Sequence, residues 1–66
     1  MQITVNGQTR EMPAGSTIAD LLRELDVAVT HVAVEVNRDL VPRSRHNEVG
    51  LADGDELEVV TLVGGG

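Results

Sequence analysis

One stretch decides how this chain folds: Leu57-Glu58-Val59-Val60-Thr61-Leu62-Val63, which runs directly into Gly64-Gly65-Gly66. The apolar residues of the run fall on two faces, which predicts a strand as the last element. The glycines have no Cβ atoms, so they predict a thin tail with a wide choice of backbone angles. Such a tail suits a narrow slot in another protein, and it ends in the ionised α-carboxylate of Gly66.

The beginning of the chain predicts a hairpin. Residues 1–6 alternate apolar and polar side chains, which is the pattern of a half-buried strand. Asn6-Gly7 follows, and both residues tolerate the positive φ angles of a tight two-residue turn. Residues 8–12 then predict a second, more polar strand at the edge of the sheet, which ends at Pro13.

A short helix is expected to begin at Ser16-Thr17. Thr17 and Asp20 have the spacing of a capping box, with Asp in place of the usual Glu. Apolar residues then recur at positions i, i+3, i+4 and i+7, namely Ile18, Leu21, Leu22 and Leu25. We expect a helix of about 8–10 residues, which packing rather than propensity must hold.

Further strands are predicted at residues 32–36, at Leu40-Val41 and from Glu56 onward, with residues 43–50 irregular. This order predicts an α+β fold, a mixed sheet of four to five strands with one helix across one face. The first and last strands are expected to pair in parallel in the middle. We treat residues 1–66 as one domain, with a globular body at 1–63 and a flexible tail at 64–66. The predicted core consists of Ile3, Val5, Ile18, Leu21, Leu22, Leu25, Val34, Val36, Leu57 and Val59.

Composition narrows the possible partners. The 66 residues include no Cys and no aromatic residue, so thiolate metal sites and disulfides are absent. The net charge of −6 argues against nucleic acid, which needs a basic patch, and suits a basic protein partner. No apolar run is long enough to span a membrane, and no leader opens the chain, so we expect a cytoplasmic protein that is monomeric when free.

The polar motifs offer no enzyme site. Asp53-Gly54-Asp55 lacks the rest of a calcium loop and is interpreted as a turn. His31 and His46 have no partner at metal or triad spacing, so we expect both to be solvated loop residues. We therefore expect no catalytic residue, no bound metal and no bound cofactor. What remains is a small body that presents a carboxylate on a thin tail.

The approach to the tail offers a docking surface. If Leu57 and Val59 face the helix, the alternation of a strand turns Val60 and Leu62 outward. Together with Val63 these residues form an apolar patch beside the tail, which is typical of a protein interaction site. The alternative is that a neighbouring loop covers them.

These segments together resemble the ThiS family, the sulfur carriers of thiamine biosynthesis, which are ubiquitin-like proteins of the β-grasp fold. The resemblance lies in Val5-Asn6-Gly7, Thr17-Ile18-Ala19-Asp20-Leu21-Leu22, Val32-Ala33-Val34-Glu35-Val36-Asn37, Val41-Pro42-Arg43-Ser44, Asp53-Gly54-Asp55, Leu57-Glu58-Val59-Val60-Thr61 and Gly65-Gly66. It spans nearly the whole chain. One departure is His46, where many relatives of that family have an aromatic residue.

The resemblance implies a mechanism. An adenylyltransferase related to ubiquitin-activating enzymes consumes ATP and Mg²⁺ to adenylate the Gly66 carboxylate. Sulfur from a donor such as a cysteine desulfurase then converts Gly66 to a thiocarboxylate, and thiazole synthase takes that sulfur. Gly64 and Gly65 give the tail its reach. The chain would be a co-substrate of these enzymes and not itself an enzyme.

Two alternatives stay open at this point. The small subunit of molybdopterin synthase has the same fold and tail chemistry, although its relatives are longer and have a Phe- and Pro-rich approach to the tail. The other alternative is a ubiquitin-like interaction module that transfers no sulfur. Intact mass after incubation with ATP, an activating enzyme and a sulfur source distinguishes the carriers from the interaction module.

Overall fold

The computed structural model describes residues 1–27 and 31–61. In chain order, the elements are β1 (Gln2–Val5), β2 (Gln8–Glu11), α1 (Ile18–Leu25), β3 (Val32–Val36), β4 (Asp39–Val41), the 3₁₀ helix η2 (Arg43–Arg45) and β5 (Glu56–Thr61). This is the predicted order of strands and helix, with η2 added in the region expected to be irregular. None of the described helices is long and apolar enough to cross a membrane.

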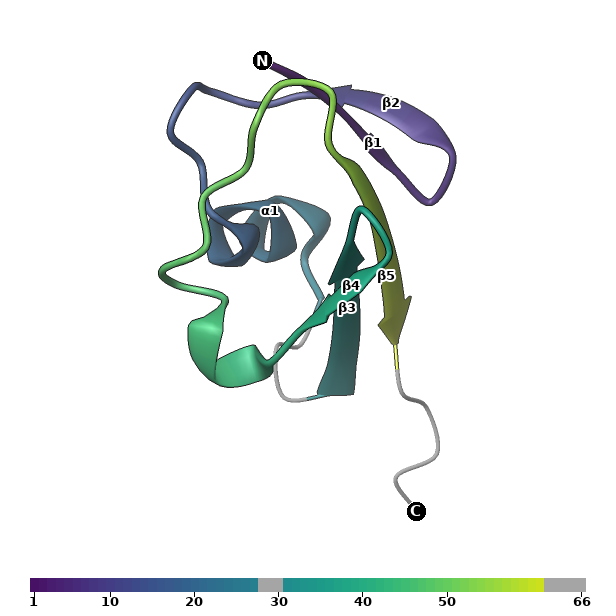
Figure 1. Cartoon of the computed structure of the whole chain (residues 1–66), viewed down its shortest axis with the longest axis vertical. Helices are drawn as coiled ribbons and strands as arrows, with labels where there is room; N and C mark the ends of the chain where they lie inside the picture. Colours follow the sequence, from purple (N-terminus) through teal and green to yellow (C-terminus); the bar gives the residue numbers. More distant parts are fainter. Residues whose placement is uncertain (28–30, 62–66) are drawn as a thin grey trace.

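The strands form one mixed sheet with the order β2-β1-β5-β3-β4 (Figure 1). β1 and β5 run parallel in its interior, with Val5 opposite Leu57, as predicted. The other pairs are antiparallel, and β2 lies at an edge, also as predicted. The parallel pair brings the first and last described strands side by side, so β5 lies in the middle of the sheet.

The two hairpins turn through residues with positive φ. Asn6 and Gly7 have φ angles of 50° and 82°, which is the two-residue turn predicted from the sequence. Asn37 and Arg38 make the second turn with φ angles of 52° and 74°. Arg38 therefore occupies a backbone region that residues other than glycine seldom adopt.

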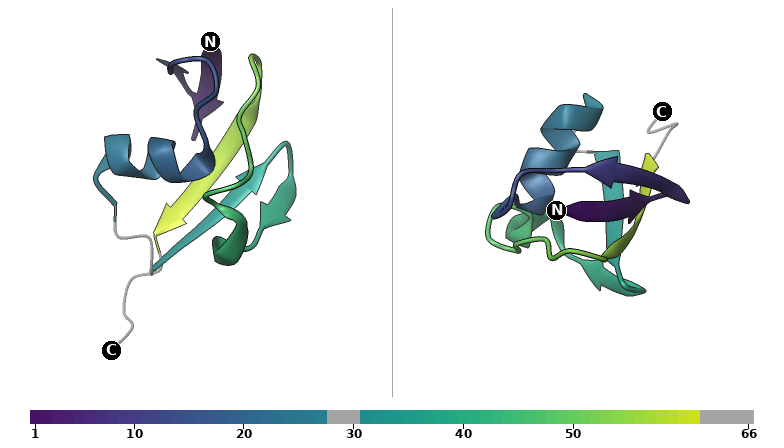
Figure 2. Two further views of the ribbon diagram at one scale, coloured as in Figure 1. Left: turned by 90° about the vertical axis from the view of Figure 1, so that its left-hand side faces the viewer. Right: turned by 90° about the horizontal axis from the view of Figure 1, so that it is seen from above.

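The helix covers one face of the sheet and leaves the other open (Figure 2). Thr17 is its N-cap, and the capping box with Asp20 is present in both directions, as the spacing predicted. The Thr17 N–H donates to an Asp20 carboxylate oxygen at 2.9 Å, and the Asp20 N–H donates to the Thr17 hydroxyl at 3.2 Å. This hydrogen bond from Thr17, with help from the neighbouring Arg23, holds the pKa of Asp20 below its usual value.

The loop after η2 completes the capping of this helix. The N–H groups of Ile18 and Ala19 have no partner within the helix and donate to the carbonyls of Val49 and His46, at 3.2 and 3.0 Å. Leu51 N–H donates to the Ser16 carbonyl at 2.8 Å. The helix is therefore held at its first turn by a segment about 30 residues away in the chain, which fixes it across the sheet.

The core lies between the helix and the sheet. Its buried residues are Ile3, Val5, Met12, Ile18, Leu21, Leu22, Val32, Val34, Leu51, Leu57 and Val59. Eight of the ten predicted core residues are in this set, and the other two, Leu25 and Val36, are only partly buried against it. Leu25 is the last residue of α1 and Val36 the last of β3, so each has fewer neighbours than a residue inside its element.

The prediction that His46 is a solvated loop residue is wrong. Its side chain is buried, with 3% of its surface exposed, and its Nε2 lies 3.1 Å from the Val41 carbonyl oxygen. Because a carbonyl can only accept, Nε2 carries the hydrogen. The backbone carbonyl of His46 also accepts from Ala19, so this residue ties η2 to both β4 and α1. These tertiary contacts bury a histidine that stands in a polar stretch of sequence.

Candidate functional site

The candidate site lies where β5 leads toward the predicted tail. Gly64, Gly65 and Gly66, as well as Leu62 and Val63, fall outside the described residues. The structure does describe Val60 and Thr61, the last two residues of β5. The site is therefore built from the strand that carries the tail and from the surface around the end of that strand.

β5 is held on both sides close to its end. On one side it pairs with β3 up to Thr61, which lies opposite Val32. On the other side β1 has already turned away, and the Asn6 side chain takes its place. The Asn6 amide donates to the Val59 carbonyl at 3.0 Å and accepts from the Val59 N–H at 2.8 Å. These contacts fix β5 up to Thr61, its last residue.

A matching contact holds the beginning of β5. The Asn37 side chain accepts from the Glu56 N–H at 3.0 Å, and its own backbone N–H donates to the Glu56 carbonyl at 2.7 Å. Asn37 also donates to the Asp55 carboxylate at 3.0 Å. Both turn asparagines thus bond to the central strand with their side chains, so the strand that carries the tail is fixed along its length.

The face of the sheet away from α1 is open and carries exposed apolar side chains. Val60 is 54% exposed and lies opposite Ala33 of β3. This confirms that Leu57 and Val59 point inward and Val60 outward. Leu40 of β4 is 67% exposed and adds an apolar side chain that is not among the predicted docking residues. Its exposure depends on the short β3–β4 hairpin, whose register places Leu40 opposite Glu35.

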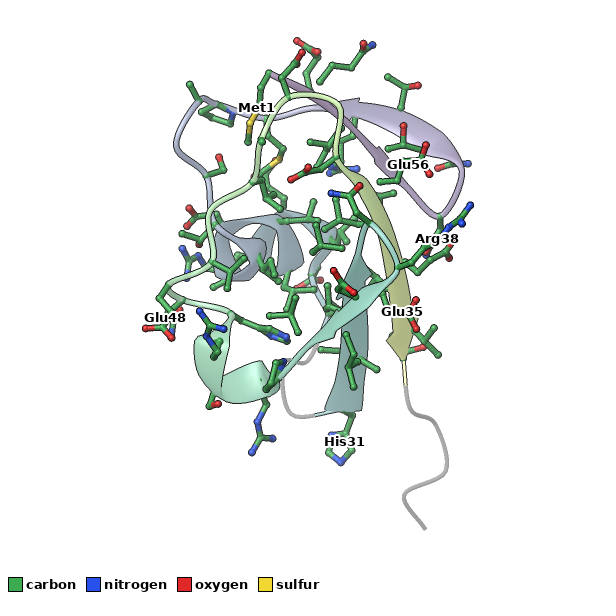
Figure 3. The ribbon with its side chains drawn as sticks, in the orientation of Figure 1. Met1, His31, Glu35, Arg38, Glu48 and Glu56 are labelled. Carbon is green, nitrogen blue, oxygen red and sulfur yellow. The ribbon has the colours of Figure 1, made fainter. Side chains whose placement is uncertain are left out.

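The same open face is acidic. Glu35 of β3 lies directly opposite Glu58 of β5, and both are exposed. Like charges directly opposite on neighbouring strands destabilise a sheet, so this pair does not serve the fold. Glu56 lies on the same face two residues before Glu58, and Figure 3 shows Glu35 and Glu56 on the side opposite α1 in this view. Apolar and acidic side chains together suit a partner surface that is apolar with basic residues around it.

The remaining candidates have structural roles or lie at the surface. Asp53 accepts from the Gln2 N–H and ties the 53–55 turn to β1, and Asp55 accepts from the Ala52 N–H within the turn. His31 is exposed at the start of β3, as predicted (Figure 3). Across residues 1–27 and 31–61, no group of three or more His, Asp or Glu side chains could hold a metal ion.

Comparisons with known proteins agree on one family. The model of the ThiS family matches residues 3–66. A sulfur carrier protein ThiS from Escherichia coli is 33% identical over 66 residues, with both chains covered completely. The crystal structure of a thiamine biosynthesis protein (ThiS) from Geobacter metallireducens superposes with a TM-score of 0.84 at 32% identity, again over the whole of both chains.

Longer proteins also match. A thiazole synthase from Paramagnetospirillum magneticum is 44% identical over 66 residues, and one from Magnetococcus marinus is 41% identical. The chain spans a fifth of the length of each of these two relatives. The family match covers nearly every residue, and the fold, with its mixed sheet and single described α-helix, is the ubiquitin-like β-grasp. The chain belongs to the ThiS family.

Proposed function

We propose that this chain is the sulfur carrier of thiamine biosynthesis and carries the sulfur atom as a thiocarboxylate on Gly66. The observation that carries the proposal is the family match, which continues beyond β5 through the last glycine. A relative that it matches over its full length is named a sulfur carrier protein. The chain acts as a co-substrate, and the catalytic groups belong to its partners.

The first step activates a poor electrophile. An oxygen of the Gly66 carboxylate attacks the α-phosphorus of ATP, and pyrophosphate leaves with its electrons. The product is a mixed anhydride whose carbonyl carbon is attacked readily because AMP is a good leaving group. An adenylyltransferase related to ubiquitin-activating enzymes supplies the active site, the ATP and the Mg²⁺.

The second step exchanges oxygen for sulfur. A persulfide sulfur, delivered by a donor such as a cysteine desulfurase, attacks the acyl carbon and displaces AMP, giving an acyl disulfide. A second thiol cleaves the S–S bond and is oxidised to a disulfide with the donor's thiol, which leaves the thiocarboxylate on Gly66. The thiazole synthase relatives, in which a similar segment belongs to one longer chain, support thiazole synthase as the sulfur acceptor.

The open face serves as the docking surface for the adenylyltransferase. Val60 and Leu40 supply apolar contact, and Glu35, Glu56 and Glu58 attract basic side chains of the partner. Leu62 and Val63 extend the apolar surface toward the active site. Because β5 is fixed up to Thr61, docking of the body determines where the tail enters the partner.

The test shortens the tail by one residue or adds a side chain to it. Deleting Gly66 shortens the reach by about 3.3–3.6 Å, which exceeds the tolerance of an attack that requires the reacting atoms about 3–3.5 Å apart. Gly65→Val adds a branched side chain to a tail that must pass through a narrow slot in the partner. We expect both changes to abolish ATP–pyrophosphate exchange and to prevent the replacement of one oxygen by sulfur in the intact mass.

Thermal melts of the same variants provide the control. Both variants should melt close to the temperature of the unchanged chain, because the core between the helix and the sheet is formed by described residues that neither change touches. Normal exchange with the Gly66 deletion would contradict the carrier function.

A further inference from the structure

The two β-hairpins of this chain are built on the same plan and differ at one position. Each turn has two residues with positive φ, and each begins with an asparagine whose side chain is hydrogen-bonded to β5. In the first hairpin the second turn residue is Gly7, with a φ of 82°. In the second hairpin the corresponding residue is Arg38, with a φ of 74°. An arginine therefore stands where a turn of this kind favours glycine.

This arginine brings the fold strain and no compensating contact. At such a φ the Cβ atom of an L-residue lies too close to the backbone, and glycine avoids the strain because it has no Cβ atom. The Arg38 side chain is exposed, and no ion pair joins it to another of the described residues. A strained residue from which the fold gains no stability points to a role in function.

Arg38 stands at the border of the open face. The backbone N–H of its neighbour Asn37 donates to the Glu56 carbonyl at 2.7 Å, which holds the turn against the start of β5. Two residues further along the chain, Leu40 is 67% exposed on the open face. Figure 3 shows Arg38 on the same side of the molecule as Glu35 and Glu56, opposite α1 in this view. The arginine is therefore a positive charge at the edge of an acidic surface.

A cation in this place restricts the partner that the open face fits. The other arginines of the chain belong to β2, α1 and η2. A partner surface with basic residues alone would attract Glu35 and Glu58 but would repel Arg38. A surface that also has a carboxylate opposite Arg38 would match all three charges. Because a guanidinium can hold a carboxylate with two parallel hydrogen bonds, Arg38 would recognise the orientation of that group as well as its charge.

We propose that Arg38 determines the specificity of docking on the open face by pairing with a carboxylate of the adenylyltransferase. This inference rests on the proposed function, because it concerns the partner that docks on that face. The pair sets the orientation of docking, since a chain rotated by half a turn on its partner would place Arg38 against basic side chains. The matching surface of the partner is therefore basic, with an acidic residue opposite the β3–β4 turn.

The first experiment measures stability and binding of the same variants. Arg38→Gly gives the second turn the glycine of the first, so the melting temperature should rise. Its affinity for the adenylyltransferase, measured by calorimetric titration, should fall about tenfold with the loss of a charged hydrogen-bonded pair. Net charge alone predicts the reverse, because the variant is more acidic than the unchanged chain. Arg10→Gln is the matched control, since it removes the same charge from β2, at the other edge of the sheet from β4, and it should bind at least as tightly as the unchanged chain.

The second experiment locates the carboxylate of the partner. The 66 residues include no lysine, so Arg38→Lys introduces a single ε-amino group. A water-soluble carbodiimide activates a carboxyl group, and an amine in contact with it then forms an amide bond while the carbodiimide leaves as a urea. Mass spectrometry of the treated complex should show position 38 joined to one Asp or Glu of the adenylyltransferase. Arg10→Lys carries the same amine on β2 and should give no such product.

Equal affinities of Arg38→Gly and Arg10→Gln would overturn the inference, and so would cross-linking at position 38 no stronger than at position 10. A lower melting temperature of Arg38→Gly would also overturn it, because Arg38 would then serve the fold. An unchanged chain that supports ATP–pyrophosphate exchange, but whose binding does not depend on Arg38, remains a carrier without this contact. If the unchanged chain neither binds the adenylyltransferase nor supports exchange, the proposed function fails, and this inference fails with it.

Discussion

The two faces of the sheet are built from alternate residues of the same strands, yet one face is buried and apolar and the other is exposed and acidic. On the helix side, Leu57 and Val59 of β5 are buried with Val34 of β3. On the open side, Val60 is more than half exposed and Glu58 lies against Glu35. A shift of one residue in the register of β5 would exchange the two sets of side chains.

The residues of the two faces differ in whether they contribute to the stability of the fold. The covered face is closed by α1, and among the described residues no charged side chain is fully buried there, as a core of this size requires. The open face combines exposed apolar side chains with two opposed carboxylates, and neither feature helps a free protein. Unfavourable features of this kind, from which the fold gains no stability, are expected at functional sites.

The largest effect is expected on the covered face. Leu22 is fully buried beneath the sheet, and Leu22→Ala should lower the free energy of unfolding by about 2–5 kcal/mol. That loss is comparable with the whole stability of so short a domain. Leu40→Ala removes the same atoms from the open face and should stay within about 0.5 kcal/mol. Urea melts measure both, and a loss under half a kcal/mol for Leu22→Ala would remove it from the core.

The next effect concerns binding. Val60→Glu places a charge in the apolar part of the open face and should weaken binding of the proposed activating enzyme by about tenfold, or roughly 1.4 kcal/mol. Thr9→Glu adds the same charge on β2, at the far edge of the sheet, and is the control. Calorimetric titration gives the affinity of each variant. Unfolding of Val60→Glu would mean that Val60 is a core residue, which would break the distinction between the faces.

Much of the covered face could be predicted from sequence because its signals are local. The Asn6-Gly7 turn, the Thr17–Asp20 capping box and the apolar stripe of α1 each depend on residues within a few positions of one another. The parallel pairing of β1 with β5 followed from the apolar faces of the two strands. These local and patterned signals agreed with the final fold, as they do in sequences that specify one structure.

The features that were missed depend on contacts between distant segments. His46 stands in a polar stretch, and its burial follows from the Val41 and Ala19 contacts, which no spacing in the sequence reveals. The opposition of Glu35 and Glu58 requires the register of β3 against β5. The groove between the β1–β2 hairpin and the C-terminal end of α1, which Arg10 lines, also requires distant segments to be placed together. The roles of Gly64, Gly65 and Gly66 are proposed from their composition and from the family match, and these residues lie outside the described part of the chain.

A smaller effect should separate the acids of the open face from ordinary surface acids. Glu58→Gln removes one of two opposed charges and should raise the free energy of unfolding by about 0.2–1 kcal/mol. The same change should slow association with a basic partner, most clearly at low salt. Glu11→Gln is the control, since Glu11 of β2 faces the neutral Gln2. Equal stability in the two variants would show that the facing carboxylates do not interact.

The smallest effect tests the cap of the helix that closes the covered face. In the folded chain the Thr17 N–H donates to the Asp20 carboxylate, so the pKa of Asp20 lies below its ordinary value of 3.8. A carboxyl group whose pKa is lower in the folded state contributes stability above its unfolded pKa and loses it as the pH falls through the folded pKa. Asp20→Asn has no charge to lose.

The difference in melting temperature between the unchanged chain and Asp20→Asn should therefore be largest near neutral pH and should vanish in acid. Asp53→Asn is the matched control, because Asp53 accepts a backbone N–H in a turn away from α1. The Asp20 difference should also shrink in high salt, because the side chain lies at the surface. A constant difference across the acid range would mean that the cap works through the shape of the side chain, with no contribution from its charge. The closure of the covered face would then depend on the hydrogen bonds of the Ser16–Leu51 region and on apolar packing alone.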